Sequence, residues 1–381
     1  MSDRHLELGV FAPTIGCAPS FGKNAFALVS SAEQRTEPTY DYNLRIAQLL
    51  DQSGLEIFFM AQRGGAGFGP ARFWSYSLDS FTTAAGLAMA TRNLQLISTV
   101  HTAFYHPGMV ARIGATLDQI SRGRWALNLV SGWAEQDFRM LDIPLLEHDK
   151  RYAQSTEFVE VLKKFWTEDW FDYAGEFFSI SQGTCYPKPA RPPLLYNAGS
   201  SPVGRDFAAR YCDWYFAGAQ APELLAEEVA DVRARAAKQG REVKVIIYLF
   251  VLCRDTEEAA RAEIEEIFAH AEFDSAREWL ETLTGQTVGT VASTLGQGVS
   301  VEDMLRSVIL GVGSGKLIGT PEQVAHALAQ FHAAGADAVG LTFRHVEEEL
   351  RDFIATVVPL LEREGVRRPR TLEADSLRAS G

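Results

Sequence analysis

The stretch RWALNLVSG, residues 124–132, is an almost continuous apolar run with a polar finish. A strand that is apolar on both faces is typical of a parallel sheet covered by helices, because both faces of such a strand are buried. Seven further runs of this kind lie at 6–13, 57–62, 94–101, 194–199, 214–219, 243–253 and 338–345. Together these runs predict eight parallel strands.

Segments of helical period separate these runs. Apolar residues recur at three and four positions in 41–53, 78–91, 107–119, 222–239 and 321–334, as they do in crossover helices. Eight strand–helix units predict a closed TIM (β/α)8 barrel. A doubly wound open sheet is the alternative, but the first strand runs into FAPTIGCAP (11–19), without the G-x-G-x-x-G turn of dinucleotide-binding sheets.

Two segments do not fit the repeat. Residues 171–180 predict a hairpin that turns at Ala174 and Gly175. Residues 272–317 are polar and Gly-rich with little strand character, which predicts either a mobile lid over the barrel mouth or a surface loop. We expect one barrel domain over 1–363 and a charged tail over 364–381. Its Arg367, Arg368 and Arg370 are expected to be solvated or to bridge subunits.

Composition narrows the class of partner. The chain has 381 residues and a net charge of −13, and it lacks a basic run of the kind that nucleic acids or anionic membranes require. No stretch of about eighteen apolar residues and no export signal is evident. The cysteines, Cys17, Cys185, Cys212 and Cys253, show no paired spacing, so we expect neither a zinc site nor disulfides. We expect a cytoplasmic protein that acts on a small molecule.

In a TIM barrel the chemistry lies where the strands end. The strand ends offer amides, hydroxyls and aromatic rings: Met60, Ala61, Gln62, Thr99, His101, Asn128, Ser131, Gly132, Trp133, Asn197, Ala198, Gly199, Thr342, Arg344 and His345. They include no nucleophile with a base, no pair of carboxylates and no metal-ligand spacing. This set predicts a site that binds a planar, polar cofactor.

The segment AGSSPVGRDFAARY, residues 198–211, has the pattern of a phosphate site. Gly199 lets the backbone approach a ligand, and Ser200 and Ser201 precede an amphipathic helix whose N-terminus favours negative charge. An ordinary N-capped helix is the alternative explanation.

Six stretches, taken together, resemble the bacterial luciferase-like flavin monooxygenases. They are EQRT (33–36), DYN (41–43), ATLDQISRGRWALNLVSGW (115–133), LEHDKRY (146–152), CDWYF (212–216) and LIGTPEQVA (317–325). The resemblance covers nearly the whole chain and is greatest to the dimethylsulfone monooxygenases, with the alkanesulfonate monooxygenases and the pyrimidine oxygenase as relatives.

The resemblance implies a TIM barrel that takes reduced FMN from a separate NAD(P)H:flavin reductase and uses dioxygen to oxygenate a small organosulfur substrate, a sulfone or sulfonate, with C–S cleavage. It also implies a homodimer or homotetramer. Three alternatives remain open. They are oxygenation of a heterocycle, amide or halogenated aromatic through a flavin N5-peroxide, a deazaflavin-dependent oxidoreductase, and a non-catalytic flavin-binding protein.

The resemblance also assigns residues. The expected FMN contacts are Ala61, Gln62, Asn128, Arg151, Tyr152 and Ser201, with Ser200 beside them. Thr99 and Asn128 are expected to stabilise the oxygenating species. His101 lies two residues after Thr99 and therefore on the same strand face, so it is either a proton-transfer group or a structural histidine.

Five residues are expected to shape the substrate pocket: Met60, Trp74, Trp133, Asp137 and Arg344. Asp137 matches an acidic residue near the substrate of the pyrimidine oxygenase, with a surface carboxylate as the alternative. Arg344 and His345 would meet a sulfonyl head or lie exposed at the rim. The pyrimidine oxygenase has a lysine at the position of Gln62, which makes uracil less favoured, whereas residues 67–81 around Phe73 and Trp74 look more like that branch.

Overall fold

The computed structural model describes residues 5–16, 38–70, 72–294 and 300–369. The stretch EQRT, Cys17 and Arg370 lie outside the described residues.

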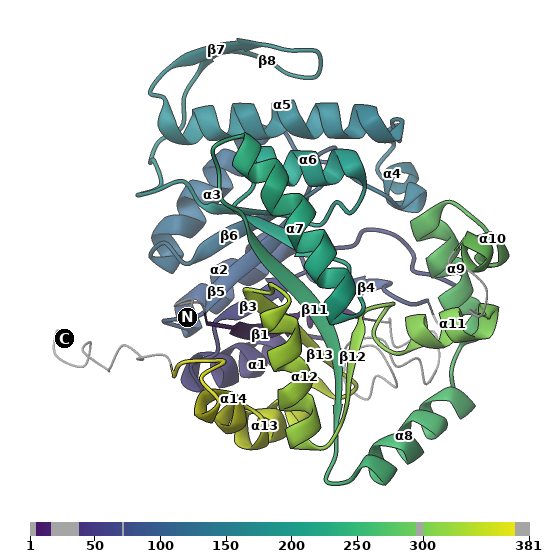
Figure 1. Ribbon diagram of the computed structural model, residues 1–381. Coiled ribbons are helices and arrows are strands. Elements are labelled where there is room, and N and C mark those ends of the chain that lie inside the picture. Colours follow the sequence, from purple (N-terminus) through teal and green to yellow (C-terminus); the bar gives the residue numbers. More distant parts are fainter. Residues whose placement is uncertain (1–4, 17–37, 71, 295–299, 370–381) are drawn as a thin grey trace, which may run out of the picture.

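The described residues form the closed parallel barrel that the sequence predicts (Figure 1). Its strands are β1 Glu7–Phe11, β3 Ile57–Met60, β5 Gln95–His101, β6 Trp125–Val130, β9 Leu194–Asn197, β10 Trp214–Ala217, β11 Lys244–Cys253 and β13 Ala338–Phe343. They pair around the barrel in chain order: β10 pairs with β11, and the last strand, β13, lies between β11 and β1 and so closes the ring. A further strand, β12 (Gly315–Gly319), pairs with the second half of β11.

Side chains alternate between the barrel interior and the surrounding helices. On β5, Ile97 packs with the interior cluster that includes Phe59, Tyr196 and Phe216, whereas Leu96 and Val100 pack outward. The period of two in a strand therefore decides which residues can reach the barrel mouth.

Helices cover the barrel. They are α1 Tyr40–Gln52, α2 Ser80–Ala90, α3 Pro107–Ser121, α5 His148–Thr167, α6 Pro202–Tyr211, α7 Pro222–Lys238, α12 Pro321–Ala333 and α13 Val346–Thr356, with the short α4 Glu135–Met140 and α14 Val358–Arg363. All five helices predicted from periodicity are confirmed. No helix in the described part of the chain is both long and apolar enough to cross a membrane.

An antiparallel hairpin, β7 Phe171–Ala174 and β8 Ser179–Gly183, lies beside α5 on the side away from the barrel (Figure 1), where the sequence predicts a hairpin. A second, shorter pairing joins β2 (Ile15–Gly16) to β4 (Tyr76–Ser77).

The segment 272–317 is more regular than its composition predicts. Its described part contains α9 Phe273–Thr284, α10 Val288–Thr294 and α11 Val301–Ile309, which follow α8 Glu257–Ala269 and lie together at the right of Figure 1. α11 begins with a capping box between Ser300 and Asp303 and buries Met304, Leu305 and Val308 at helical spacing. These helices enclose an apolar cluster of their own against the barrel mouth.

The first residues after α14 pack against the barrel. Arg367 is 1% exposed, pairs with Glu56 at 2.8 Å and Glu362 at 2.7 Å, and donates to the carbonyl oxygen of Gly54. The expectation that Arg367 is solvated or bridges subunits is therefore wrong. It links the residues after α14 to the segment that leads into β3.

Candidate active site

A cavity of about 1410 Å³ opens at the carboxyl ends of the barrel strands. Its wall contains strand-end residues from β5, β6, β9 and β10, and residues of α9 and α11 close it on the other side. The cavity therefore lies where a TIM barrel places its chemistry.

Thr99 and Asn128 form the polar centre of this cavity. They face each other in the register between β5 and β6, and the Asn128 amide Nδ2 donates to Thr99 Oγ1 at 3.2 Å. Asn128 is 4% exposed, and its Oδ1 has no hydrogen-bond partner among the described residues. Since a buried acceptor without a donor costs about 1–3 kcal/mol, this oxygen favours a ligand that carries an N–H or O–H group.

His101 follows on the same face of β5 and also lines the cavity. Its Nε2 lies 3.3 Å from the carbonyl oxygen of Gln62, and its ring stacks on Phe104 with 4.9 Å between centroids. Burial lowers the pKa of His101 to about 4, with Arg63 contributing, while the contact with Gln62 opposes the shift. The imidazole is thus neutral near pH 7, and its role in proton transfer stays a prediction.

Ala61 and Gln62 line the cavity directly after β3. The Gln62 Oε1 accepts from the Ser80 backbone N–H at 3.1 Å and from Ser80 Oγ at 2.8 Å, which fixes the side chain at the start of α2. Its Nε2 lies 3.5 Å from Tyr105 Oη.

The residues predicted to hold a phosphate come together at the start of α6. Ser201 caps this helix, and its Oγ accepts from the Gly204 N–H at 3.2 Å. A Cβ on Gly199 would lie 2.3 Å from the hydroxyl of Tyr152, so only glycine permits this close approach. Arg151 donates to the carbonyl oxygen of Gly132 from the neighbouring wall. Ser200 lines the cavity beside them, and burial raises the pKa of Tyr152 and lowers that of Arg151.

Arg63 is a cavity residue that the sequence analysis missed. Its side chain is 3% exposed, and its Nη2 lies 3.3 Å from the carboxylate of Asp137. Its guanidinium carbon lies 4.7 Å from the ring centroid of Phe68 and 4.9 Å from that of Trp133. Burial lowers the pKa of Arg63 to about 10 and raises that of Asp137. The sequence feature that could have pointed to Arg63 is its position immediately after Gln62, at the same strand end.

The predicted substrate-pocket residues divide into two groups. Trp74 and Trp133 line the cavity, and Asp137 lies behind the wall as the partner of Arg63. Met60 does not line the cavity: it is fully buried in the outer cluster, because it alternates with Phe59, which faces inward.

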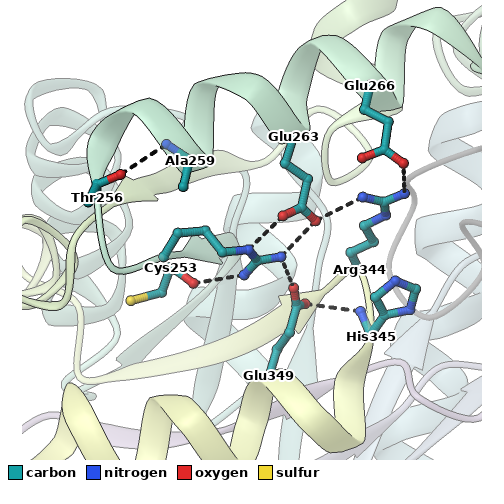
Figure 2. A network of polar contacts seen from close by, with 9 residues as sticks. Cys253, Thr256, Ala259, Glu263, Glu266, Arg344, His345 and Glu349 are labelled. Carbon is teal, nitrogen blue, oxygen red and sulfur yellow. Dashed lines mark hydrogen bonds and ion pairs between the residues drawn. The ribbon is translucent and has the colours of Figure 1, made fainter.

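Arg344 also lies away from the cavity. It is 6% exposed, and Nη1 pairs with Glu263 of α8 at 2.8 Å while Nη2 lies 3.7 Å from Glu266 (Figure 2). Glu263 also binds Arg254, which pairs with Glu349 of α13. Arg344 therefore joins α8 to the barrel, and the sequence analysis had not identified α8 as its partner.

A parallel barrel with a large polar and aromatic cavity at the carboxyl ends of its strands has the architecture of a TIM-barrel enzyme, and the cavity is suited to hold a cofactor. The family model of the luciferase-like monooxygenases matches residues 21–338. The chain belongs to this family and is a monooxygenase.

Two monooxygenases and one solved structure are similar to this chain over most of their length. The FMNH(2)-dependent dimethylsulfone monooxygenase of Pseudomonas putida is 37% identical over 338 residues, which cover 88% of this chain and 91% of that protein. The pyrimidine monooxygenase RutA of Enterobacter sp. (strain 638) is 32% identical over 365 residues, 94% and 96% of the two chains. The crystal structure of a riboflavin lyase, solved with modified FMN and riboflavin, superposes with a TM-score of 0.84 at 25% identity, over 97% of this chain and 94% of that one.

Proposed function

We propose that this monooxygenase oxygenates a small organosulfur compound, with carbon–sulfur cleavage, at the Thr99–Asn128 pair. The enzyme uses reduced FMN and dioxygen, in agreement with relatives that are named as FMNH(2)-dependent. The observation that carries the proposal is that the cavity contains both a buried amide, whose oxygen has no partner among the described residues, and the serine-capped N-terminus of α6.

The described residues fit FMN. Ser200, Ser201 and Arg151 provide hydroxyls, a helix N-terminus and a cation for the phosphate. The isoalloxazine ring carries N–H groups, and Asn128 Oδ1, which has no partner among the described residues, could accept from one of them. When bound, reduced FMN supplies the two electrons that activate dioxygen.

The side chains of the cavity would then stabilise developing negative charge and exclude water. The Asn128 amide nitrogen fixes Thr99 Oγ1 inside the barrel, so the Thr99 hydroxyl proton would be the donor, and preorganised donors stabilise developing negative charge most strongly in such a place. Trp74, Trp133 and Trp279 of α9 cover the cavity and exclude water. One oxygen atom would enter a C–H bond next to sulfur and the other would leave as water. An α-hydroxy sulfone formed in this way separates into an aldehyde and a sulfinate.

Two further elements belong to this proposal. A separate NAD(P)H:flavin reductase would supply the reduced FMN, and the protein would assemble as a homodimer or homotetramer. Gel filtration with light scattering tests the assembly. Turnover with NADH, FMN and an unrelated flavin reductase tests whether supplied FMNH2 is sufficient.

The central experiment compares ligands and oxygen dependence. FMN should bind more tightly than riboflavin, because riboflavin lacks the phosphate that Ser200, Ser201 and Arg151 would hold. With reduced FMN and air, a dialkyl sulfone should be consumed and an aldehyde should form, and neither should happen without oxygen. Equal affinity for FMN and riboflavin, or turnover that needs a deazaflavin and no oxygen, would contradict the proposal.

A further inference from the structure

Four cavity residues form an aromatic compartment, which we define as Arg63, Trp74, Trp133 and Trp279. The ring centroids of Trp74 and Trp279 lie 5.9 Å apart, and those of Trp133 and Trp279 lie 6.4 Å apart. Trp279 comes from α9, whereas the others follow β3 and β6. The compartment therefore forms where the helices of 272–317 meet the barrel mouth.

Every polar side-chain atom of this compartment is an N–H donor, because neither indole nor guanidinium can accept a hydrogen bond. Within the described chain, Trp74 Nε1, Trp279 Nε1 and the Arg63 guanidinium nitrogens are buried without a hydrogen-bond partner. Arg63 has only its ion pair with Asp137 and its ring contacts. Buried donors without acceptors are rare in folded proteins, and each one favours a ligand that supplies acceptor oxygens.

Trp74 is also held in an unusual backbone conformation. Its φ of 61° lies in the left-handed region, which bulky residues seldom adopt. Such conformations persist where the surroundings impose them and are concentrated at binding sites. The chain thus holds this indole at the cavity against its backbone preference.

The charge of the compartment favours an uncharged ligand. Arg63 and Asp137 form a buried pair of opposite charges, so a neutral acceptor adds no uncompensated charge. An anionic sulfonate would add one. A pyrimidine would bring its own N–H donors to a wall that already consists of donors.

We propose that the aromatic compartment is the substrate site and that it selects uncharged compounds with acceptor oxygens and no donors, the chemistry of a dialkyl sulfone. The inference rests on the proposed function and names its substrate class. Trp74, Trp133 and Trp279 surround the alkyl groups, while Arg63 and the two indole N–H groups meet the sulfonyl oxygens.

Equilibrium binding separates this inference from catalysis. Protein saturated with oxidised FMN, which supports no turnover, is titrated by calorimetry with diethyl sulfone, diethyl sulfide, ethanesulfonate and uracil. We expect the sulfone to bind roughly tenfold or more tightly than each of the others, because only the sulfone is neutral and purely accepting. Uracil, the sulfonate or the sulfide binding as tightly as the sulfone overturns the inference.

Variants locate the binding. Trp279→Phe keeps a ring and removes one N–H, so sulfone affinity should fall roughly three- to tenfold while sulfide affinity stays the same. The double variant Arg63→Met with Asp137→Asn removes both charges together, which avoids a lone buried carboxylate, and should cost roughly tenfold or more. Trp170→Phe is the matched control, because Trp170 is 67% exposed.

Circular dichroism and FMN affinity show whether each variant is folded. A folded Trp279→Phe variant that binds the sulfone as the parent does contradicts the proposed site. If FMN binds and the sulfone does not, this inference fails and the assignment of the cofactor stands. If FMN itself does not bind, the proposed function fails.

Discussion

Asn128 shows how one residue can differ from its strand. Its neighbours Leu127 and Leu129 pack outward under the helices, and Asn128 faces the barrel interior beside Thr99. A polar side chain in a core strand must find partners or face a ligand, and here the amide nitrogen has a partner while the oxygen has none among the described residues.

Asn128→Ala should therefore impair chemistry more than folding. We expect oxygenation to fall roughly 10²-fold, the usual effect of losing one preorganised donor, because Asn128 would no longer position the Thr99 hydroxyl, and hydrogen peroxide should be released instead. Oxygen uptake and peroxide are measured together. Asn197→Ala is the comparison, because Asn197 donates to Leu129 O at 2.8 Å and accepts from Gly199 N at 2.9 Å. Asn197→Ala should lower the free energy of unfolding more than Asn128→Ala does, because both of those hydrogen bonds lie within the protein. Unchanged coupling in Asn128→Ala would contradict the assignment.

His101 gives a pH dependence of stability. Its folded-state pKa of about 4 lies below the ordinary value of 6.5, so the unfolded chain binds the proton more readily. The contribution of neutral His101 to the free energy of unfolding is fully present above about pH 6.5 and is lost as the pH falls toward 4. Between pH 7 and pH 5 the loss is about 2 kcal/mol.

Urea unfolding at the two pH values measures this change. His101→Gln should remove most of that difference, whereas replacement of the exposed His326 by Gln should leave it unchanged. An equal pH dependence in His101→Gln would show that other groups are responsible.

At the level of elements, the sequence pattern was sufficient to predict the strands of the barrel and five of its helices. Each of the eight predicted runs contains an observed strand, and the five periodic segments are helices, because patterns of two and 3.6 residues are local properties. Two of the residues expected in the substrate pocket lie elsewhere, and in both cases the difference is one of direction. Met60 faces the outer helices, and Arg344 turns to α8, whose position depends on distant packing.

The helices of 272–317 were missed for a related reason. Gly, Ser and Thr are frequent there and have low helix propensity, so the composition does not predict helices. These short amphipathic helices are stabilised by packing their apolar faces against the barrel mouth. Arg63 was missed because its neighbours Trp133 and Asp137 come from another strand end.

Arg367 links elements that are far apart in the sequence. Removing it by Arg367→Met should cost about 3 kcal/mol, because Glu56 would keep its charge at a partly buried position without its cation. Chemical denaturation provides the measurement. Arg363→Met, an exposed position on α14, should change stability by less than about 0.5 kcal/mol. Similar effects of the two substitutions would contradict the structural role of Arg367.

At the scale of the whole molecule, the described residues form three apolar clusters: one between the barrel and its outer helices, one inside the barrel, and one under the helices of 272–317. The cavity lies among residues of all three. A ligand that fills it should therefore stabilise the molecule as a unit.

FMN should raise the melting temperature in a concentration-dependent manner. At a concentration one hundred times the dissociation constant, the gain in unfolding free energy is about 2.7 kcal/mol. Differential scanning calorimetry with FMN and with riboflavin measures it. The gain should be smaller for Arg151→Ala with FMN, and this variant should distinguish FMN from riboflavin less than the parent does, because Ser200, Ser201 and the N-terminus of α6 remain. A melting temperature independent of FMN would contradict binding at this cavity.

Trp279 is brought to the cavity by a segment that interrupts the barrel between β11 and β12. The residues that fit the cofactor lie on other units of the chain, so the two tasks can diverge separately. Exchange of this one segment between relatives should redirect substrate choice while oxygen activation is inherited unchanged. The barrel with its cofactor site would then stay the same in such relatives, and a new substrate specificity would arise by replacement of the segment 272–317 alone.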